Sequence, residues 1–190
     1  YEIKIASSEN APEKIKKFLN LNLKRYNLRP LNFKKKKEIL PYVDQMFNLL
    51  DSTYNTLQTY VPIQDYQIKH YKEKYIRYVS PDLIKCVVNK ENDLIGFVII
   101  MPSFAKALRK INGKLFPFGF LHILKASFFY NKASFYLIGI RPEFQNKGIT
   151  AILFNEIQKT FNKRNISIVE TNPELEENIA IQNNWKNYQN

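Results

Sequence analysis

One stretch of the sequence, residues 140–150, combines the residue types that hold a bound phosphate. It reads Ile-Arg-Pro-Glu-Phe-Gln-Asn-Lys-Gly-Ile-Thr and lies between a predicted strand and a predicted helix. Backbone N–H groups at the start of a helix carry a partial positive charge that suits a phosphate or pyrophosphate. Gly148 lets the backbone approach the anion closely, and Lys147 adds a cation. We therefore predict an anion-binding turn here, although similar loops also open helices that bind nothing.

The same residues resemble the motif of the GNAT superfamily of N-acetyltransferases. In that family a strand ends in a hydrophobic-x-Pro turn, followed by Arg/Gln-x-x-Gly-x-Gly/Ala. Here Ile140-x-Pro142 and the run 145–150 match it, with Thr150 in place of the last small residue. The likeness in the order of elements extends over residues 28–188, whereas the specific motif is confined to the turn.

The resemblance implies that acetyl-CoA is the co-substrate and that its acetyl group passes directly to a primary amine. The sequence leaves the identity of this amine open. Backbone groups of two strand residues would pair with the pantetheine arm, and the turn would cradle the pyrophosphate. The residues implied to bind the cofactor are Gly139, Ile140, Gln145, Asn146, Lys147, Gly148, Ile149, Thr150 and Asn178.

The resemblance also implies a general acid and a general base. Relatives often carry an asparagine on the last helix, an apolar residue three positions on and a tyrosine seven positions on; here the spacing gives Asn178, Ile181 and Trp185. Because the tryptophan N–H has no useful acidity, Tyr188 is the alternative acid, or else an ordinary surface tyrosine. Glu170 is the candidate base because it ends a predicted strand where the cleft would open. The simpler alternative, which the residues favour, is that Glu170 serves as a cap or neutralises a nearby lysine.

Metal chemistry is not indicated by the sequence. His70 and His122 stand without cysteine, aspartate or a second histidine at ligand spacing. Cys86 is the only cysteine, so it has no partner for an internal disulfide, and we expect it to be a small buried residue. A cytoplasmic location is therefore the expectation. A protein partner, or a domain preceding Tyr1, stays open.

The charge of the chain favours an anionic partner. Lysine and arginine number 29 against 17 acidic residues, which gives a net charge of +12. Nucleic acid and an anionic membrane surface fit that sign, but without a motif we rank both below acetyl-CoA. A noncatalytic interaction module of the GNAT fold is the second hypothesis, because of Trp185. No apolar run reaches the ~18 residues of a membrane-spanning helix.

The helices and strands that must position the turn follow from the hydrophobic pattern. Asn10 and Glu13 form a capping box at the start of the first helix. Runs rich in valine and isoleucine predict strands, and Pro30 marks the first of them as an edge strand. The predicted helices cover 11–26, 38–51, 65–79, 148–162 and 173–185, and the predicted strands cover 28–33, 83–88, 94–101, 133–140 and 166–171.

The fold class that follows is α/β (α+β), a GNAT-like mixed central sheet flanked by helices. The alternation of strand and helix in the second half predicts neighbouring parallel strands. Between the third and fourth strands lies an aromatic and basic insertion, residues 102–131, which we interpret as two short helices. It could pack in the core, wall a substrate pocket, anchor at a membrane interface or present a docking surface for another protein domain. We divide the chain into an N-terminal helical extension, residues 1–27, and a GNAT-like acyltransferase domain, residues 28–190.

Overall fold

The computed structural model divides the chain into two compact units. Unit 1 holds Tyr1–Ser8, Ile100–Tyr136 and Phe161–Asn190, and unit 2 holds Glu9–Ile99 and Leu137–Thr160. The boundary crosses three elements, β4 (Leu94–Pro102), β5 (Lys132–Ile140) and α6 (Ile149–Arg164). The predicted division at residue 27 stays a prediction. The structure describes residues 2–4, 13–55, 61–74, 79–112, 114, 116 and 118–171.

The strands form a mixed sheet, as the sequence predicts. In unit 2, β2 (Arg29–Asn32) pairs antiparallel with β3 (Ile84–Val88), and β3 pairs antiparallel with β4. In unit 1, β6 (Ile168–Glu170) pairs parallel with the first residues of β5. The hydrogen-bonded order is β1-β6-β5-β4-β3-β2. Pro30 lies in the edge strand β2, where its missing N–H is tolerated.

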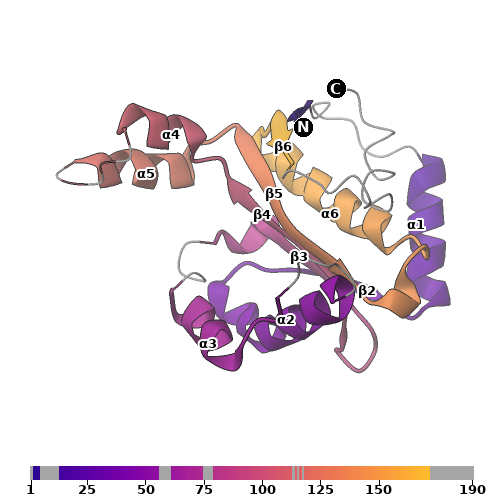
Figure 1. Cartoon of the computed structure of the whole chain (residues 1–190). Helices are drawn as coiled ribbons and strands as arrows, with labels where there is room; N and C mark the ends of the chain where they lie inside the picture. The colour runs from indigo at the N-terminus through magenta and orange to yellow at the C-terminus, as the bar shows by residue number, and fades with distance from the viewer. Residues whose placement is uncertain are drawn as a thin grey trace. The chain divides into compact units, whose positions relative to one another are not determined.

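Two helices of unit 2 cover opposite faces of its strands (Figure 1). Helix α2 (Leu40–Tyr54) follows the short 3₁₀ turn η1 (Lys36–Glu38) and buries apolar side chains against alternate residues of β3. Helix α6 buries its apolar stripe on the other face. The α2 side of this core includes Val43, Met46, Leu49, Leu50, Ile84, Cys86, Val88, Leu94 and Phe97. The buried α6 residues include Ile149, Ile152, Leu153 and Ile157.

Cys86 confirms its predicted role. The side chain is fully buried in β3, and burial raises the pKa of its thiol well above the ordinary range. A thiol that stays protonated at neutral pH is a poor nucleophile. Cys86 is therefore a packing residue.

Two further helices flank these elements in unit 2. Helix α1 (Glu13–Arg25) and helix α3 (Asp65–Lys74) match the predicted helices 11–26 and 65–79 over the described residues, and positions 75–78 lie outside them. A second 3₁₀ turn, η2 (Pro81–Leu83), leads into β3. The boundaries of β3, β4, β5 and α6 lie within two residues of those predicted.

Unit 1 contains the predicted insertion as two short helices. They are α4 (Ala105–Lys110) and α5 (Gly119–Phe128), which follow β4 and precede β5. Unit 1 also contains β1 (Glu2–Lys4), a strand that the sequence analysis did not predict and that pairs antiparallel with β6. The predicted last helix, 173–185, lies outside the described residues.

Candidate functional site

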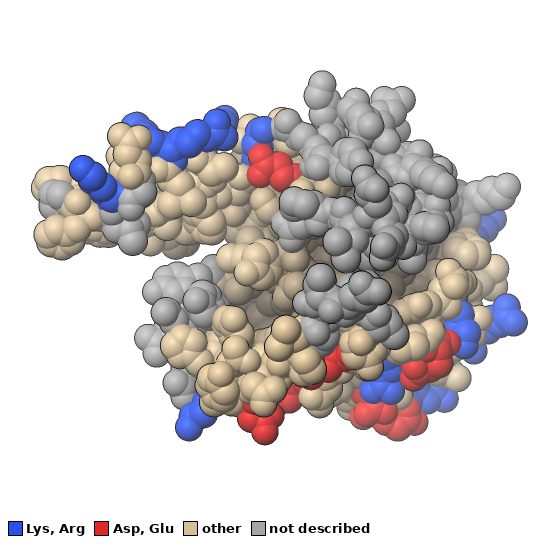
Figure 2. Space-filling model, viewed as in Figure 1, with Lys and Arg blue, Asp and Glu red and all other residues tan. Residues whose placement is uncertain are grey.

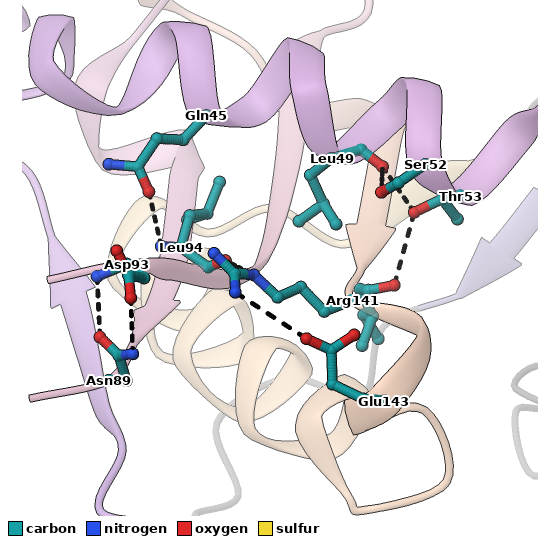
Figure 3. Close-up of polar contacts among 10 residues, drawn as sticks. Gln45, Leu49, Ser52, Thr53, Asn89, Asp93, Leu94, Arg141 and Glu143 are labelled. Carbon is teal, nitrogen blue, oxygen red and sulfur yellow. Dashed lines mark hydrogen bonds and ion pairs between the residues drawn. The ribbon is translucent and has the colours of Figure 1, made fainter. Parts of the chain in front are cut away.

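Arg141 anchors the turn that follows β5 to the start of β4. Its backbone N–H donates to the carbonyl oxygen of Ile95 (2.9 Å), and its Nε donates to that of Leu94 (2.6 Å). The Leu94 N–H donates in turn to Oε1 of Gln45 on α2 (2.7 Å), as Figure 3 shows. Arg141 Nη1 also lies 3.8 Å from Oε1 of Glu143 in an exposed ion pair. The turn is thus tied to both a strand and a helix before α6 begins.

Some backbone N–H groups of the turn are used within the turn itself. Pro142 to Phe144 form the 3₁₀ turn η3. The N–H of Gln145 donates to the carbonyl oxygen of Pro142 (3.2 Å), and that of Lys147 donates to the carbonyl oxygen of Phe144 (3.3 Å). The Gln145 side chain points back at the strand, with Nε2 3.5 Å from the carbonyl oxygen of Ile140. Two of the predicted donors are therefore committed to local structure.

Other N–H groups of the turn are not used in this way. The helical hydrogen bonds of α6 begin with Ile152, whose N–H donates to the carbonyl oxygen of Gly148 (3.1 Å). The N–H groups just before it lie at the positive end of a 16-residue helix. Within the residues that the structure describes, no acceptor pairs with the N–H groups of Asn146, Gly148, Ile149 and Thr150.

Gly148 has a structural reason to be glycine that the sequence did not reveal. Its φ of +79° lies in the left-handed region, where the backbone of a residue with a Cβ is strained. A Cβ on Gly148 would also lie 2.6 Å from Nδ2 of Asn22 and 3.4 Å from the ring of Phe18, both on α1. Helix α1 therefore packs directly on the turn. Asn146, with φ +61°, makes the other left-handed step before α6.

Lys147 is held by two aromatic rings. Its ammonium group lies 5.3 Å from the ring centroid of Tyr26 and 5.1 Å from that of Phe144, within the range of cation–π attraction. The two rings meet edge to face with their centroids 6.2 Å apart. Sequence reasoning treated Lys147 only as a cation of the turn and missed both rings. Phe144 could have been found, because it lies three residues before Lys147, but Tyr26 is distant in sequence.

Two hydroxyl groups of α2 approach carbonyl groups of β5. The Tyr54 hydroxyl donates to the carbonyl oxygen of Ile138 (3.0 Å), and the Thr53 hydroxyl lies 3.4 Å from that of Ile140. Because the Arg141 N–H points toward β4, the strand alternation turns Ile138 and Ile140 away from β4 and Gly139 toward it. Burial raises the pKa of the Tyr54 phenol, which keeps it a neutral donor. Sequence reasoning assigned no role to Thr53 or Tyr54.

Glu170 lies in unit 1 among serine hydroxyls. Its Oε2 accepts hydrogen bonds from Oγ of Ser103, just after β4 (2.9 Å), and from Oγ of Ser134 on β5 (3.3 Å). The Ser103 N–H is fixed by the carbonyl oxygen of Lys132 (3.0 Å). Two neutral hydroxyl donors hold the carboxylate in place.

The described part of the chain holds no cluster of three metal-binding side chains. His70 and His122 therefore have no described group of ligands to join.

Comparison by sequence finds a curated relative but no matching family model. No family model matches the chain. Protein YghO of Escherichia coli (strain K12) is 24% identical over 176 residues, which covers 89% of this chain and 44% of that protein. The chain thus spans less than half the length of this relative.

Comparison by structure decides the fold. An acetyltransferase of the GNAT family from Staphylococcus aureus Mu50 matches with a TM-score of 0.53 at 11% identity, over 84% of this chain and 82% of that one. A GCN5-related N-acetyltransferase from Sphaerobacter thermophilus gives 0.52 at 12% identity, over 80% and 37%. The C-terminal domain of a putative lysylphosphatidylglycerol synthetase from Agrobacterium fabrum gives 0.53 at 9% identity, over 88% and 43%. The chain has the GNAT fold.

The residues implied by the GNAT resemblance fall into three groups in this structure. Those of the turn, residues 145–150, lie together with the end of β5 in unit 2. Glu170 lies in unit 1 with its two serines. Asn178 and Tyr188 lie outside the described residues.

Proposed function

We propose that this chain is an acyltransferase that binds acetyl-CoA and transfers its acetyl group to a primary amine. The observation that carries the proposal is the turn between β5 and α6, with N–H groups at the start of a long buried helix in a GNAT fold. The solved structures that share this fold include proteins named as N-acetyltransferases, which supports the same reaction class here.

The pyrophosphate would be bound by the N–H groups of the turn that have no described acceptor. The charge at the start of α6 and the Lys147 ammonium favour a phosphate at this position. Gln145 and Lys147 would contribute through their side chains, because their N–H groups already donate within the turn. The binding N–H groups we propose are those of Asn146, Gly148, Ile149 and Thr150.

The pantetheine arm would lie along the side of β5 that faces away from β4. Ile138 and Ile140 present their backbone groups on that side. Tyr54 now donates to the carbonyl oxygen of Ile138, and Thr53, whose hydroxyl donates to Leu49 (2.7 Å), lies near that of Ile140. Gly139 would support the arm by its position in the strand. Tyr54 would keep the Ile138 carbonyl group ordered until an amide of the arm replaces its hydroxyl as the donor.

The transfer itself needs one proton removed and one supplied. The amine nitrogen forms a bond to the thioester carbonyl carbon, and the bond from that carbon to sulfur breaks. We assign Glu170 as the base that takes the proton lost by the amine, directly or through a water molecule. We assign Tyr188 as the acid that protonates the departing thiolate, with Asn178 contacting the coenzyme.

Thr150→Glu tests the binding step without weakening the helix. A carboxylate in the first turn of α6 complements the helix dipole, so the fold should be retained. The same carboxylate would repel a pyrophosphate, and we expect the affinity for acetyl-CoA in calorimetry to fall at least about tenfold. Gln158→Glu adds the same charge in the middle of α6 and should bind normally. Equal affinity of both variants and the unchanged protein for acetyl-CoA would show that the turn does not bind the cofactor.

Thiol release separates the enzyme from a noncatalytic module of the same fold. Trp185, at the position where relatives carry the acidic tyrosine, is the observation that favours such a module. If acetyl-CoA binds, release of free thiol with a library of primary amines would support the enzyme. Binding without release for every amine would favour the interaction module, and no binding would reject both.

A further inference from the structure

The insertion in unit 1 exposes an aromatic surface that no described residue covers. Its two helices lie side by side and extend beyond the ends of β4 and β5 to which they are joined (Figure 1). Phe116 and Phe118, between the helices, are 87% and 71% exposed, and Phe128 and Phe129, at the end of α5, are 70% and 78% exposed. We call residues 103–132, which contain α4, α5 and the segments that join them to each other and to the sheet, the hairpin.

Helix α5 has apolar residues on two opposite sides. Ile123 and Ala126 lie on the half-buried side. At 3.6 residues per turn, four large apolar residues fall within an arc of about 100° on the other side, and all four are exposed. They are Phe120, Leu121, Leu124 and Phe128. Core packing therefore accounts for only one side of α5.

The charges of the hairpin have a single sign. Residues 103–132 contain six lysines and arginines and no aspartate or glutamate. In Figure 2 the lysine and arginine side chains of the hairpin gather along one edge, next to uncharged surface. A short amphipathic element with phenylalanine and leucine on one face and cations beside them is typical of segments that lie in a membrane interface. The cations are Lys106, Arg109, Lys110, Lys114, Lys125 and Lys132.

We propose that the hairpin docks on an anionic phospholipid surface, with its aromatic residues inserted among the lipids and its cations at the headgroups. Such lipids complement the charge of the hairpin, whereas a second copy of this chain would bring six more cations to the same face. The aliphatic residues Leu121 and Leu124 fit acyl chains better than they fit nucleic acid, which uses stacking on aromatic rings.

The docking we propose is at the interface and not across the membrane. None of the helices in the described ranges has the length and the apolar character to span a bilayer. The 10 residues of α5 extend about 15 Å, half the thickness of a bilayer core.

Vesicle co-sedimentation with the whole chain tests the proposal. We expect binding to vesicles rich in phosphatidylglycerol and little binding to pure phosphatidylcholine. The double variant F116S/F118S changes residues outside the helices, so folding should be retained, and it should lower the apparent affinity at least about tenfold. The control L21S/V61S removes two side chains that are 66% and 78% exposed elsewhere and should bind normally.

A second set of variants tests the charge. K106Q/R109Q/K110Q should weaken binding most at low salt, because headgroup attraction is screened by salt. The control K34Q/K36Q/K37Q removes three exposed lysines of unit 2 and should have a smaller effect. Absence of vesicle binding, or equal losses in the test and control variants, would overturn the proposal. Concentration-dependent dimers abolished by F116S/F118S, without vesicle binding, would assign the face to a second copy, and binding of RNA in place of vesicles would assign it to nucleic acid.

Discussion

Helices α6 and α5 show two different uses of apolar residues. Helix α6 buries Ile152, Leu153 and Ile157 on the sheet, whereas α5 has no buried residue along its 10 residues. Burial fixes the position of α6, so the N–H groups at its start are held in one place and are suited to recognise a small anion. The exposed apolar side of α5 gains no such stabilisation from the residues that the structure describes. The first helix builds a site, and the second presents a surface.

The largest expected effect comes from matched leucine substitutions in the two helices. Leu153 of α6 is 0% exposed and Leu124 of α5 is 53% exposed. Leu153→Ala should lower the free energy of unfolding by about 3 kcal/mol, since it removes buried contacts and leaves a cavity. Leu124→Ala should lower it by less than about 1 kcal/mol. Urea denaturation measures both, and a loss for Leu124→Ala as large as that for Leu153→Ala would show that α5 is part of the core.

A middle-sized effect is expected at the turn that begins α6. Gly148→Ala should lower the free energy of unfolding by about 2 kcal/mol, because the left-handed backbone is strained with a Cβ. Part of this loss comes from the approach of Asn22. Asn22→Ala should therefore recover part of the lost stability when it is combined with Gly148→Ala. Thermal unfolding of the unchanged protein, the two single variants and the double variant would show this. Strict additivity of the two substitutions would mean that α1 does not press on the turn.

The elements that the sequence predicts well are those whose signals are local. The valine- and isoleucine-rich runs of β3 and β4, the proline in β2 and the Pro142 to Gly148 turn each depend on a few adjacent residues, and the structure confirms these elements. Strand β1 was missed because its three residues carry no pattern and its partner β6 is far along the chain. The insertion was predicted as two helices, but its composition could not show which residues stay exposed.

The candidate site divides in the same way. The turn residues follow from a local motif, and the structure brings them together. The contacts of Asn22 with Gly148, of Tyr26 with Lys147 and of Tyr54 with Ile138 join residues that lie more than 80 positions apart, so no spacing rule could reveal them. Assignment of Asn178 and Tyr188 depends on the motif alone and stays a prediction.

A polar network gives α6 a second difference from α5. Lys85, only 3% exposed in β3, donates from Nζ to Oδ1 of Asn32 (2.6 Å), and Nδ2 of Asn32 donates to Oε2 of Glu156 on α6 (2.8 Å). Lys159 forms an ion pair with Glu156 from the next turn of the helix. A buried lysine is costly unless polar partners surround it, so this network helps to fix the position of α6 on the sheet.

The smallest effect we predict is the pH dependence that Glu156 brings to stability. Desolvation by burial would raise the pKa of its carboxyl, but the hydrogen bonds from Lys159 and Asn32 and the charges of Lys159 and Lys85 outweigh it, so the pKa is lowered. A group with a lowered pKa stabilises the fold above its unfolded pKa of about 4.3 and loses that contribution as the pH falls through the folded pKa.

Glu156→Gln should therefore lower the free energy of unfolding at neutral pH by about 1 kcal/mol, because the amide keeps the shape but not the charge. The difference from the unchanged protein should shrink as the pH falls below about 4, where the wild-type carboxylate takes up its proton. Glu91→Gln, at an exposed position in the loop between β3 and β4, is the matched control. It should leave the free energy of unfolding at neutral pH unchanged. Urea denaturation of the three proteins at several pH values would check this. A difference in the free energy of unfolding that stays constant with pH would mean that Glu156 acts through its shape and not its charge. Burial of apolar residues would then be the one difference between α6 and α5 that matters for stability.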